Sequence, residues 1–193
     1  MHMSIPINEI INFIGIVTLL MMLPGPNTIL VMQTFGILGR RAALYNIAGI
    51  VTAIYIHSFL SAFGLSIIIV KSAQMYMLIK YAGAAYIIYL GVVSIFSVYN
   101  QTDDTSSVTD ESTIKQKNCD SPFKLYTQGL ISNILNPKVA LFFLSLFPQF
   151  IHNHNAVLVE SLMLTFIYTL IAIAWYAILM AFVNKMGSYL ENN

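Results

Sequence analysis

The sequence predicts an all-α integral membrane protein, a bundle of about five transmembrane helices. The first observation is composition: of 193 residues, 58% are hydrophobic and only 9% are charged, whereas a typical soluble domain has about 25% charged residues. The second is mean hydropathy, which is +0.75. A water-soluble chain of this length could not bury so much apolar surface, so the excess must face lipid. The third is that charged residues fall in short intervals between long uncharged stretches.

Each apolar stretch is long enough to cross a bilayer as a helix, for which about 20 residues suffice. The fourth stretch contains a single charge, Lys138. A spanning segment must satisfy its own backbone hydrogen bonds, and the alternating pattern of a membrane β-barrel is missing from the sequence, so helices are expected. The expected spans are 10–34, 43–70, 75–98, 126–150 and 157–184.

The chain is expected to form a single membrane domain, residues 1–193. It divides into a first repeat at 10–98, a polar cytoplasmic loop at 99–124 and a second repeat at 125–193. The loop is rich in Asp, Lys, Ser and Thr and has little apolar surface to bury. The first apolar stretch is interpreted as a retained helix, because it is too long for a signal peptide and lacks a basic start.

Orientation follows from lysine and arginine near the ends of the spans, which favour the cytoplasmic side. One face carries only Lys71. The opposite face carries the larger set, which comprises Arg40, Arg41, Lys115, Lys117, Lys124 and Lys185. This bias predicts an N-terminus outside and a C-terminus inside.

Proline interrupts two of the expected spans near their middles. The first contains Pro24 and Pro26, and the fourth contains Pro137. Proline removes a backbone donor and clashes with the preceding turn, so both helices should kink or unwind there. Such breaks persist in a membrane mainly where they line a cavity or face other helices. The alternative is that they are simple kinks, since proline is common in membrane helices.

The two breaks occupy corresponding positions in the two halves of the chain. Gly15 precedes the first break by about the same distance as Gly129 precedes the second. An odd number of helices in each repeat would invert the second copy, bringing Asn27 and Asn136 together near the membrane midplane. Free N–H and C=O groups at half-helix ends suit the carboxylate and ammonium of a substrate, which favours a transporter.

Several short motifs carry a family resemblance. They are MLPGPN at 22–27, GRRAAL at 39–44, AG at 48–49, the segment 51–64 with His57, KYAGAAYIIYLG at 80–91, GL at 129–130, and NPK at 136–138 followed by FF at 142–143. In combination they resemble the LysE/RhtB family of amino-acid exporters, with a likeness that extends from about residue 10 to about residue 184.

The resemblance implies export of small amino acids or their derivatives across the bacterial inner membrane, driven by the proton gradient. It also implies six hydrophobic segments in two related halves. Here the sequence ends at Asn193, where a sixth segment would begin. The second half is therefore expected to lack its last helix. A partner copy in a homo-oligomer would fill that gap; the alternative is a truncated, inactive remnant or an accessory subunit.

The candidate substrate-binding residues flank the two breaks. They are Pro24, Gly25, Pro26, Asn27, Asn136, Pro137 and Lys138. Asparagine donates and accepts hydrogen bonds, so it can hold a zwitterion without a buried charge; the alternative role is capping its own half-helix. Lys138 is an intramembrane ionisable residue, which is a functional hypothesis by default. The alternative is that the Lys138 side chain has no role in the site and extends to the membrane interface.

His57 is the candidate for proton coupling, because imidazole titrates near neutrality. The alternative is a neutral imidazole bonded to the carbonyl of a neighbouring helix. Three small residues are assigned to close helix packing instead of chemistry: Gly49, Gly83 and Gly91.

An enzyme is disfavoured. The single cysteine, Cys119, makes no redox pair, and His57 and Ser58 are adjacent, so they point to different sides of a helix. With no phosphate-binding GxxxxGK[ST] motif in the sequence and a net charge of +1, neither a cofactor, a metal nor nucleic acid is expected. The expected partners are a small amino acid, a proton and the lipid bilayer. Acidic residues are expected to be missing from the spans, which favours a neutral amino acid over a cationic one.

Overall fold

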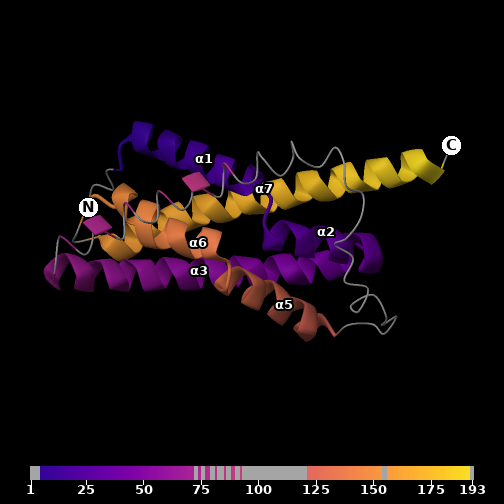
Figure 1. Ribbon diagram of the computed structural model, residues 1–193, viewed down its shortest axis with the longest axis horizontal. Helices are drawn as coiled ribbons and strands as arrows, with labels where there is room; N and C mark the ends of the chain where they lie inside the picture. The colour runs from indigo at the N-terminus through magenta and orange to yellow at the C-terminus, as the bar shows by residue number, and fades with distance from the viewer. Residues whose placement is uncertain are drawn as a thin grey trace.

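The computed structural model describes residues 5–71, 74, 77–78, 81, 85, 88–89, 92, 121–153 and 156–191. Every regular element in this part of the chain is helical, so the predicted all-α bundle is confirmed (Figure 1). The predicted packing residues Gly83 and Gly91 and loop residues 99–120 lie outside the described residues.

The first expected span is two helices, α1 (Ile7–Met22) and α2 (Pro26–Leu38), which meet at an angle of 60°. Pro26 is the first residue of α2, where its missing N–H breaks no helical bond. Gly39, with a φ of 82°, forms the turn to α3 (Arg40–Lys71), a conformation that glycine adopts without strain. Arg40 and Arg41, expected between the spans, are the first two residues of α3.

The fourth expected span is also broken. It consists of α5 (Pro122–Ile134) and α6 (Pro137–Leu141), and the two halves of the span bend by 52°. After α6 the chain continues as a π-helical turn (Phe142–Leu146) and a 3₁₀ turn (Phe147–Phe150), neither of which the sequence predicted. The final helix is α7 (Val157–Glu191).

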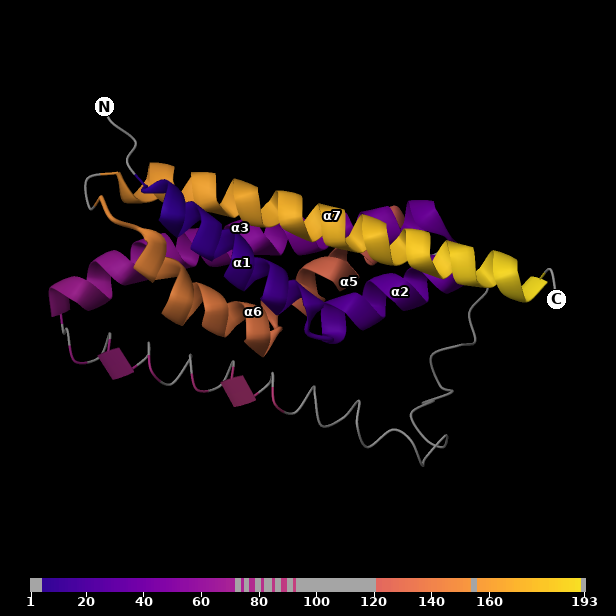
Figure 2. The same ribbon diagram turned by 90° about the horizontal axis from the view of Figure 1, so that it is seen from above.

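The described helices correspond to four of the five expected spans. Two continuous segments, Arg40–Phe63 and Val157–Lys185, are long and apolar enough to cross a membrane, and each bent pair can form one further span. The third expected span, 75–98, lies mostly outside the described residues. The two broken spans run in opposite directions: α1 leads to α2 from one end of the bundle, and α5 leads back to α6 from the other (Figures 1 and 2).

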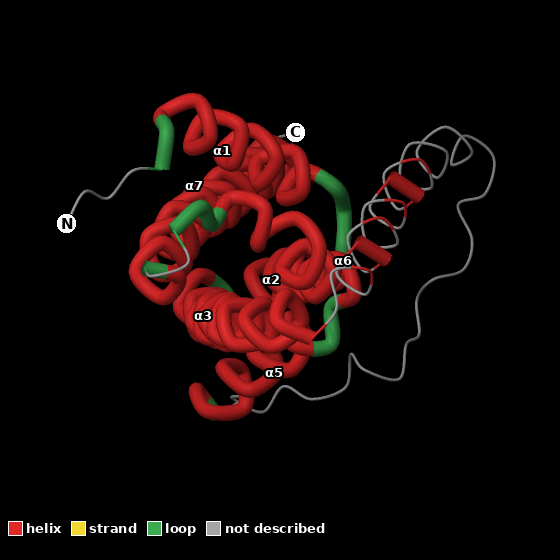
Figure 3. The backbone as a smooth tube through the Cα atoms, turned by 90° about the vertical axis from the view of Figure 1, so that its left-hand side faces the viewer, coloured by secondary structure: helices red, strands yellow, loops and turns green. Residues whose placement is uncertain are grey.

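Helix α7 lies between α1 and α3, and α5 lies against the outer side of α3 (Figure 3). Aromatic rings fill the space between α1, α7 and the segment after the second break. Phe13 of α1 meets Phe150 at 5.1 Å between ring centroids, and Tyr168 of α7 meets both Phe142 and Phe143 at 5.5 Å. These contacts hold the second half-helix of the fourth span against both α1 and α7.

Helices α3 and α5 cross with their backbones in contact. A Cβ atom on Gly49 would overlap the carbonyl oxygen of Tyr126, and one on Gly129 would overlap that of Asn46. The amide of Asn46 also donates to the Leu125 carbonyl at 2.7 Å. Small residues at such a crossing let two membrane helices approach closely.

Candidate functional site

The two breaks face each other in the middle of the bundle and are joined by a pair of asparagines. Asn27, in the first turn of α2, donates from Nδ2 to Oδ1 of Asn133 in α5 at 2.7 Å. Ser132 donates its hydroxyl to Oδ1 of Asn27 at 2.9 Å. Both asparagines are buried. An amide-to-amide bond at this depth satisfies polar groups that would otherwise be costly in hydrocarbon.

Asn133 extends this network to α3. Its Nδ2 donates to the carbonyl of Ile50 at 2.9 Å, and its own carbonyl lies 3.2 Å from Nε2 of His57. A carbonyl only accepts, so Nε2 carries the hydrogen and Nδ1 is the nitrogen that can gain or lose a proton. The His57 ring stacks on Phe143 with centroids 5.7 Å apart. His57 is thus one hydrogen bond away from the second break.

The sequence predicted that Asn27 would approach Asn136, but the residue it bonds is Asn133, one turn earlier. Asn136 caps α6 instead: its Oδ1 accepts the backbone N–H of Lys138 at 3.1 Å. The Nδ2 of Asn136 is buried and has no hydrogen-bond partner among the residues that the structure describes. Sequence reasoning missed Asn133 as a site residue; its signal was a second asparagine in the polar stretch before Pro137.

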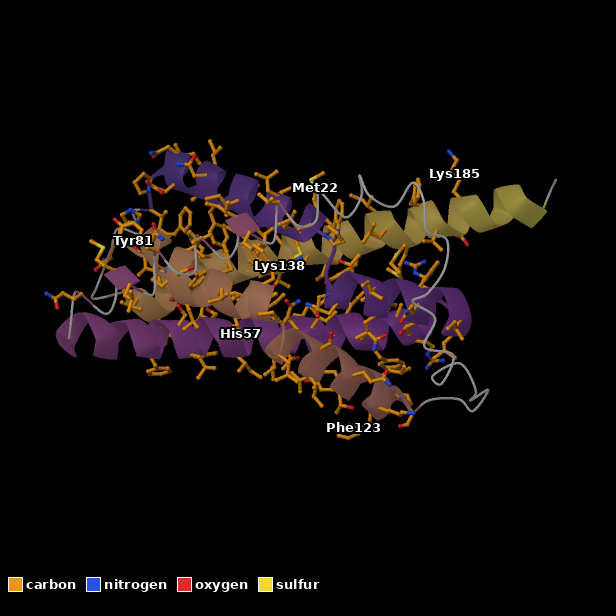
Figure 4. All side chains as sticks on the ribbon, in the orientation of Figure 1. Met22, His57, Tyr81, Phe123, Lys138 and Lys185 are labelled. Atoms are coloured by element: carbon orange, nitrogen blue, oxygen red, sulfur yellow. The ribbon has the colours of Figure 1, made fainter. Side chains whose placement is uncertain are left out.

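Lys138 joins the second break to the first. Its ammonium donates to the carbonyl of Leu20 at 3.1 Å and to that of Leu23 at 2.8 Å. Carbonyls at the end of a helix have no partner within that helix, and here a lysine of another span supplies it. The Lys138 side chain is only 9% exposed and is directed at the end of α1. Figure 4 shows Lys138 and His57 in the middle of the bundle.

A cavity of about 90 Å³ lies between the two breaks. That is enough room for several water molecules. Its walls contain most of the predicted substrate-binding residues, and comprise Leu23, Pro24, Gly25, Pro26, Asn136, Pro137 and Lys138. Gly25 faces the lysine directly, since a Cβ there would lie 3.1 Å from Nζ of Lys138. Asn27 and His57 are not part of these walls, and both connect to the second break through Asn133.

The prediction that acidic residues are missing from the spans was wrong at one position. Glu160, in the first turn of α7, is 1% exposed. Its carboxylate accepts the backbone N–H groups of His152 at 2.8 Å and Asn153 at 3.2 Å, which ties the preceding turn to α7. Glu160 lies within the expected span 157–184, and the sequence analysis overlooked it.

Ser58 does not pair with His57. Its hydroxyl accepts a hydrogen bond from Thr165 of α7 at 2.6 Å. Within the described ranges, no group of three or more His, Cys, Asp and Glu side chains is placed to hold a metal ion.

The model of a family described as LysE type translocator matches residues 18–192. The chain is 32% identical over 188 residues to the uncharacterized membrane protein YrhP of Bacillus subtilis (strain 168), covering 96% of this chain and 88% of that protein. It is 33% identical over 165 residues to the homoserine/homoserine lactone efflux protein of Salmonella typhimurium (strain LT2), covering 84% and 75%.

A further relative is the leucine efflux protein of Klebsiella pneumoniae subsp. pneumoniae. The two chains are 27% identical over 145 residues, which is 75% of this chain and 64% of the relative. No solved structure matches the chain.

Proposed function

This chain belongs to the LysE type translocator family, and from that premise we propose that it exports neutral amino acids across the bacterial inner membrane, driven by the proton gradient. Its relatives include bacterial proteins named for the efflux of leucine and of homoserine or its lactone. The binding site in this proposal is the space between the two broken helices. A transporter role, in place of enzymatic chemistry, also agrees with the separate partners of His57 and Ser58.

The observation that carries the proposal is the direct bond between Asn27 and Asn133 across the two breaks. Interrupted helices in opposite orientation, meeting at mid-bundle around a cavity, are the arrangement in which secondary transporters bind substrates. A side-chain bond between the two breaks couples their positions, so a substrate that alters one break acts on the other.

The chemistry of the cavity supports a neutral substrate. The polar side chains in its walls are one amide and one ammonium, from Asn136 and Lys138. A cationic amino acid would bring a second ammonium into the membrane interior, and none of the residues lining the cavity offers a carboxylate to compensate that charge.

Proton coupling is assigned to His57. Protonation at Nδ1 would place a positive charge one hydrogen bond from the second break, through the Asn133 carbonyl. That charge would change the energy of the site whenever an ionic substrate is present, which is the differential interaction that coupling requires.

The test is efflux from cells that lack their own exporters and are preloaded with a panel of labelled neutral amino acids. We expect efflux that a protonophore abolishes, and its loss in the double variant Asn27→Ala, Asn133→Ala. The matched control is Asn184→Ala, at an exposed position of α7. Well-expressed protein that moves no amino acid would overturn the proposal.

Substitution of His57 separates transport from coupling. In His57→Gln, the amide can still donate to the Asn133 carbonyl but does not titrate. We expect this variant to exchange internal for external amino acid at close to the normal rate in proteoliposomes, while it no longer drives net efflux with an imposed pH gradient. Intact pH-driven efflux would remove His57 from the mechanism and leave the exporter assignment standing.

A further inference from the structure

We propose that Lys138 and Asn136 form a subsite for a carboxylate group in the cavity between the two breaks. The inference rests on the proposed function, because this is where an exported amino acid would place its carboxylate. It goes further in naming the two side chains that bind and the part of the substrate that they recognise.

The first observation is an uncompensated charge. The Lys138 ammonium is 9% exposed, and its hydrogen-bond partners are two neutral carbonyls, of Leu20 and Leu23. No acidic side chain of the described ranges forms an ion pair with it. A buried charge is costly unless it is paired, and an ammonium has three donors, of which the two carbonyls use two. A carboxylate would supply both the missing charge and the third acceptor.

The second observation is an unused donor beside that charge. Asn136 is 1% exposed, and its Oδ1 is engaged in capping α6, but its Nδ2 has no partner within the described part of the chain. Buried amide nitrogens are nearly always hydrogen-bonded, and leaving one unpaired costs free energy. Asn136 and Lys138 line the same cavity. The two groups present donors only, which suits an anion with several lone pairs.

The third observation is the start of α2, which borders the cavity at Gly25 and Pro26. No side chain caps this 13-residue helix at its N-terminus, so its positive end adds to the field of the ammonium. Gly25 keeps the ammonium accessible, because a Cβ would lie 3.1 Å from Nζ. Three independent features thus favour negative charge at one place.

Ligands without a carboxylate should therefore bind less well. One charge-assisted hydrogen bond lost corresponds to about tenfold in affinity. Leucine should bind at least about tenfold more tightly than leucinamide, and homoserine more tightly than homoserine lactone.

The first experiment uses a carboxylate that is not an amino acid. The melting temperature of the purified full-length protein is measured in sodium propionate and in sodium chloride of equal ionic strength. We expect propionate to raise it in the wild type and in Lys124→Met, a control at an exposed lysine of α5, but not in Lys138→Met. An equal response in wild type and Lys138→Met would overturn the subsite.

A second variant tests the subsite independently, in case Lys138→Met does not fold. Asn136→Asp keeps the cap of α6, because aspartate caps as well as asparagine, and places a permanent carboxylate beside Lys138. We expect an unchanged or higher melting temperature together with loss of the response to propionate. A propionate response that persists in Asn136→Asp would contradict the proposal.

The third experiment joins the subsite to transport. Competition by leucine, leucinamide, homoserine and homoserine lactone is measured in counterflow assays with the wild type and Asn136→Asp. The variant should lose the preference for the acid over its amide or lactone. If propionate stabilises the protein but no amino acid is transported, the carboxylate subsite is supported and the proposed export function is refuted. If Asn136→Asp still transports amino acids and still prefers the acid over its amide or lactone, the export function is supported and the carboxylate subsite is refuted.

Discussion

At the scale of single residues, Asn133 connects the most distant parts of the site. Its side chain bonds Asn27 of α2 and Ile50 of α3, and its carbonyl bonds His57. These hydrogen-bonding groups are buried, so water does not replace a lost partner. Removing one member of a bond therefore leaves the other unpaired. The asparagine pair is therefore a structural joint as well as a candidate binding element.

We predict an energetic coupling between Asn27 and Asn133. Asn27→Ala and Asn133→Ala should each lower the free energy of unfolding by about 1–3 kcal/mol, because each strands a buried polar group. The double variant should lose less than the sum of the single losses. Denaturant unfolding in detergent micelles measures this cycle. Additive losses would mean that the two amides do not interact.

Glu160 allows a second comparison, between charge and hydrogen bonding. Glu160→Ala should destabilise the protein by about 1–3 kcal/mol, because the N–H groups of His152 and Asn153 lose their acceptor. Glu160→Gln keeps an acceptor oxygen and should lose less. Thermal unfolding distinguishes them, and equal losses in the two variants would show that the negative charge, not the accepted bonds, holds the turn.

At the scale of elements, the crossing of α3 and α5 leaves no room for a methyl group. Gly49→Ala should destabilise the protein by about 1–3 kcal/mol, because the new atom meets backbone and the helices must separate. Gly15→Ala in α1 is the matched control: no atom of the described residues lies within 4 Å of its Cβ, and alanine favours the helix by about 0.5–1 kcal/mol. Melting temperatures that move in the same direction for both would argue against this crossing.

The helices themselves were largely predictable, because a bilayer demands long apolar stretches and proline interrupts a helix wherever it falls. The breaks at Pro24–Pro26 and at Pro137 follow from covalent geometry alone. The partner of each break was not predictable, since it depends on how far one helix slides along another. A shift of one turn replaced Asn136 by Asn133 opposite Asn27.

The environment of Lys138 was only partly predictable. The sequence shows a charge at membrane depth but not the direction of its side chain, which the 52° bend after α5 turns toward the end of α1. The π-helical and 3₁₀ turns after α6 were missed for a similar reason, because the packing of Phe142, Phe143 and Phe147 against α1 and α7 determines them, and local propensity does not.

At the scale of the whole molecule, the beginning of α1 and the end of α7 lie at opposite ends of the bundle (Figure 1). From the charge bias of the sequence we predict that the C-terminal end lies in the cytoplasm. The single cysteine, Cys119, belongs to the predicted cytoplasmic loop. A membrane-impermeant thiol reagent should therefore label it in permeabilised cells and leave it unlabelled in intact ones. Labelling in intact cells would show that the chain has the opposite orientation to the predicted one.

The absence of space at the α3–α5 crossing has a consequence for how the exporter would work. Two helices whose backbones touch cannot slide past one another. In any alternating-access cycle of the proposed exporter, α3 and α5 would therefore have to move as one rigid unit. The C-terminal end of α1 is held by the Lys138 ammonium through the carbonyls of Leu20 and Leu23. A ligand that draws the ammonium away from these carbonyls would remove this attachment and leave the aromatic contacts of Phe13 in place.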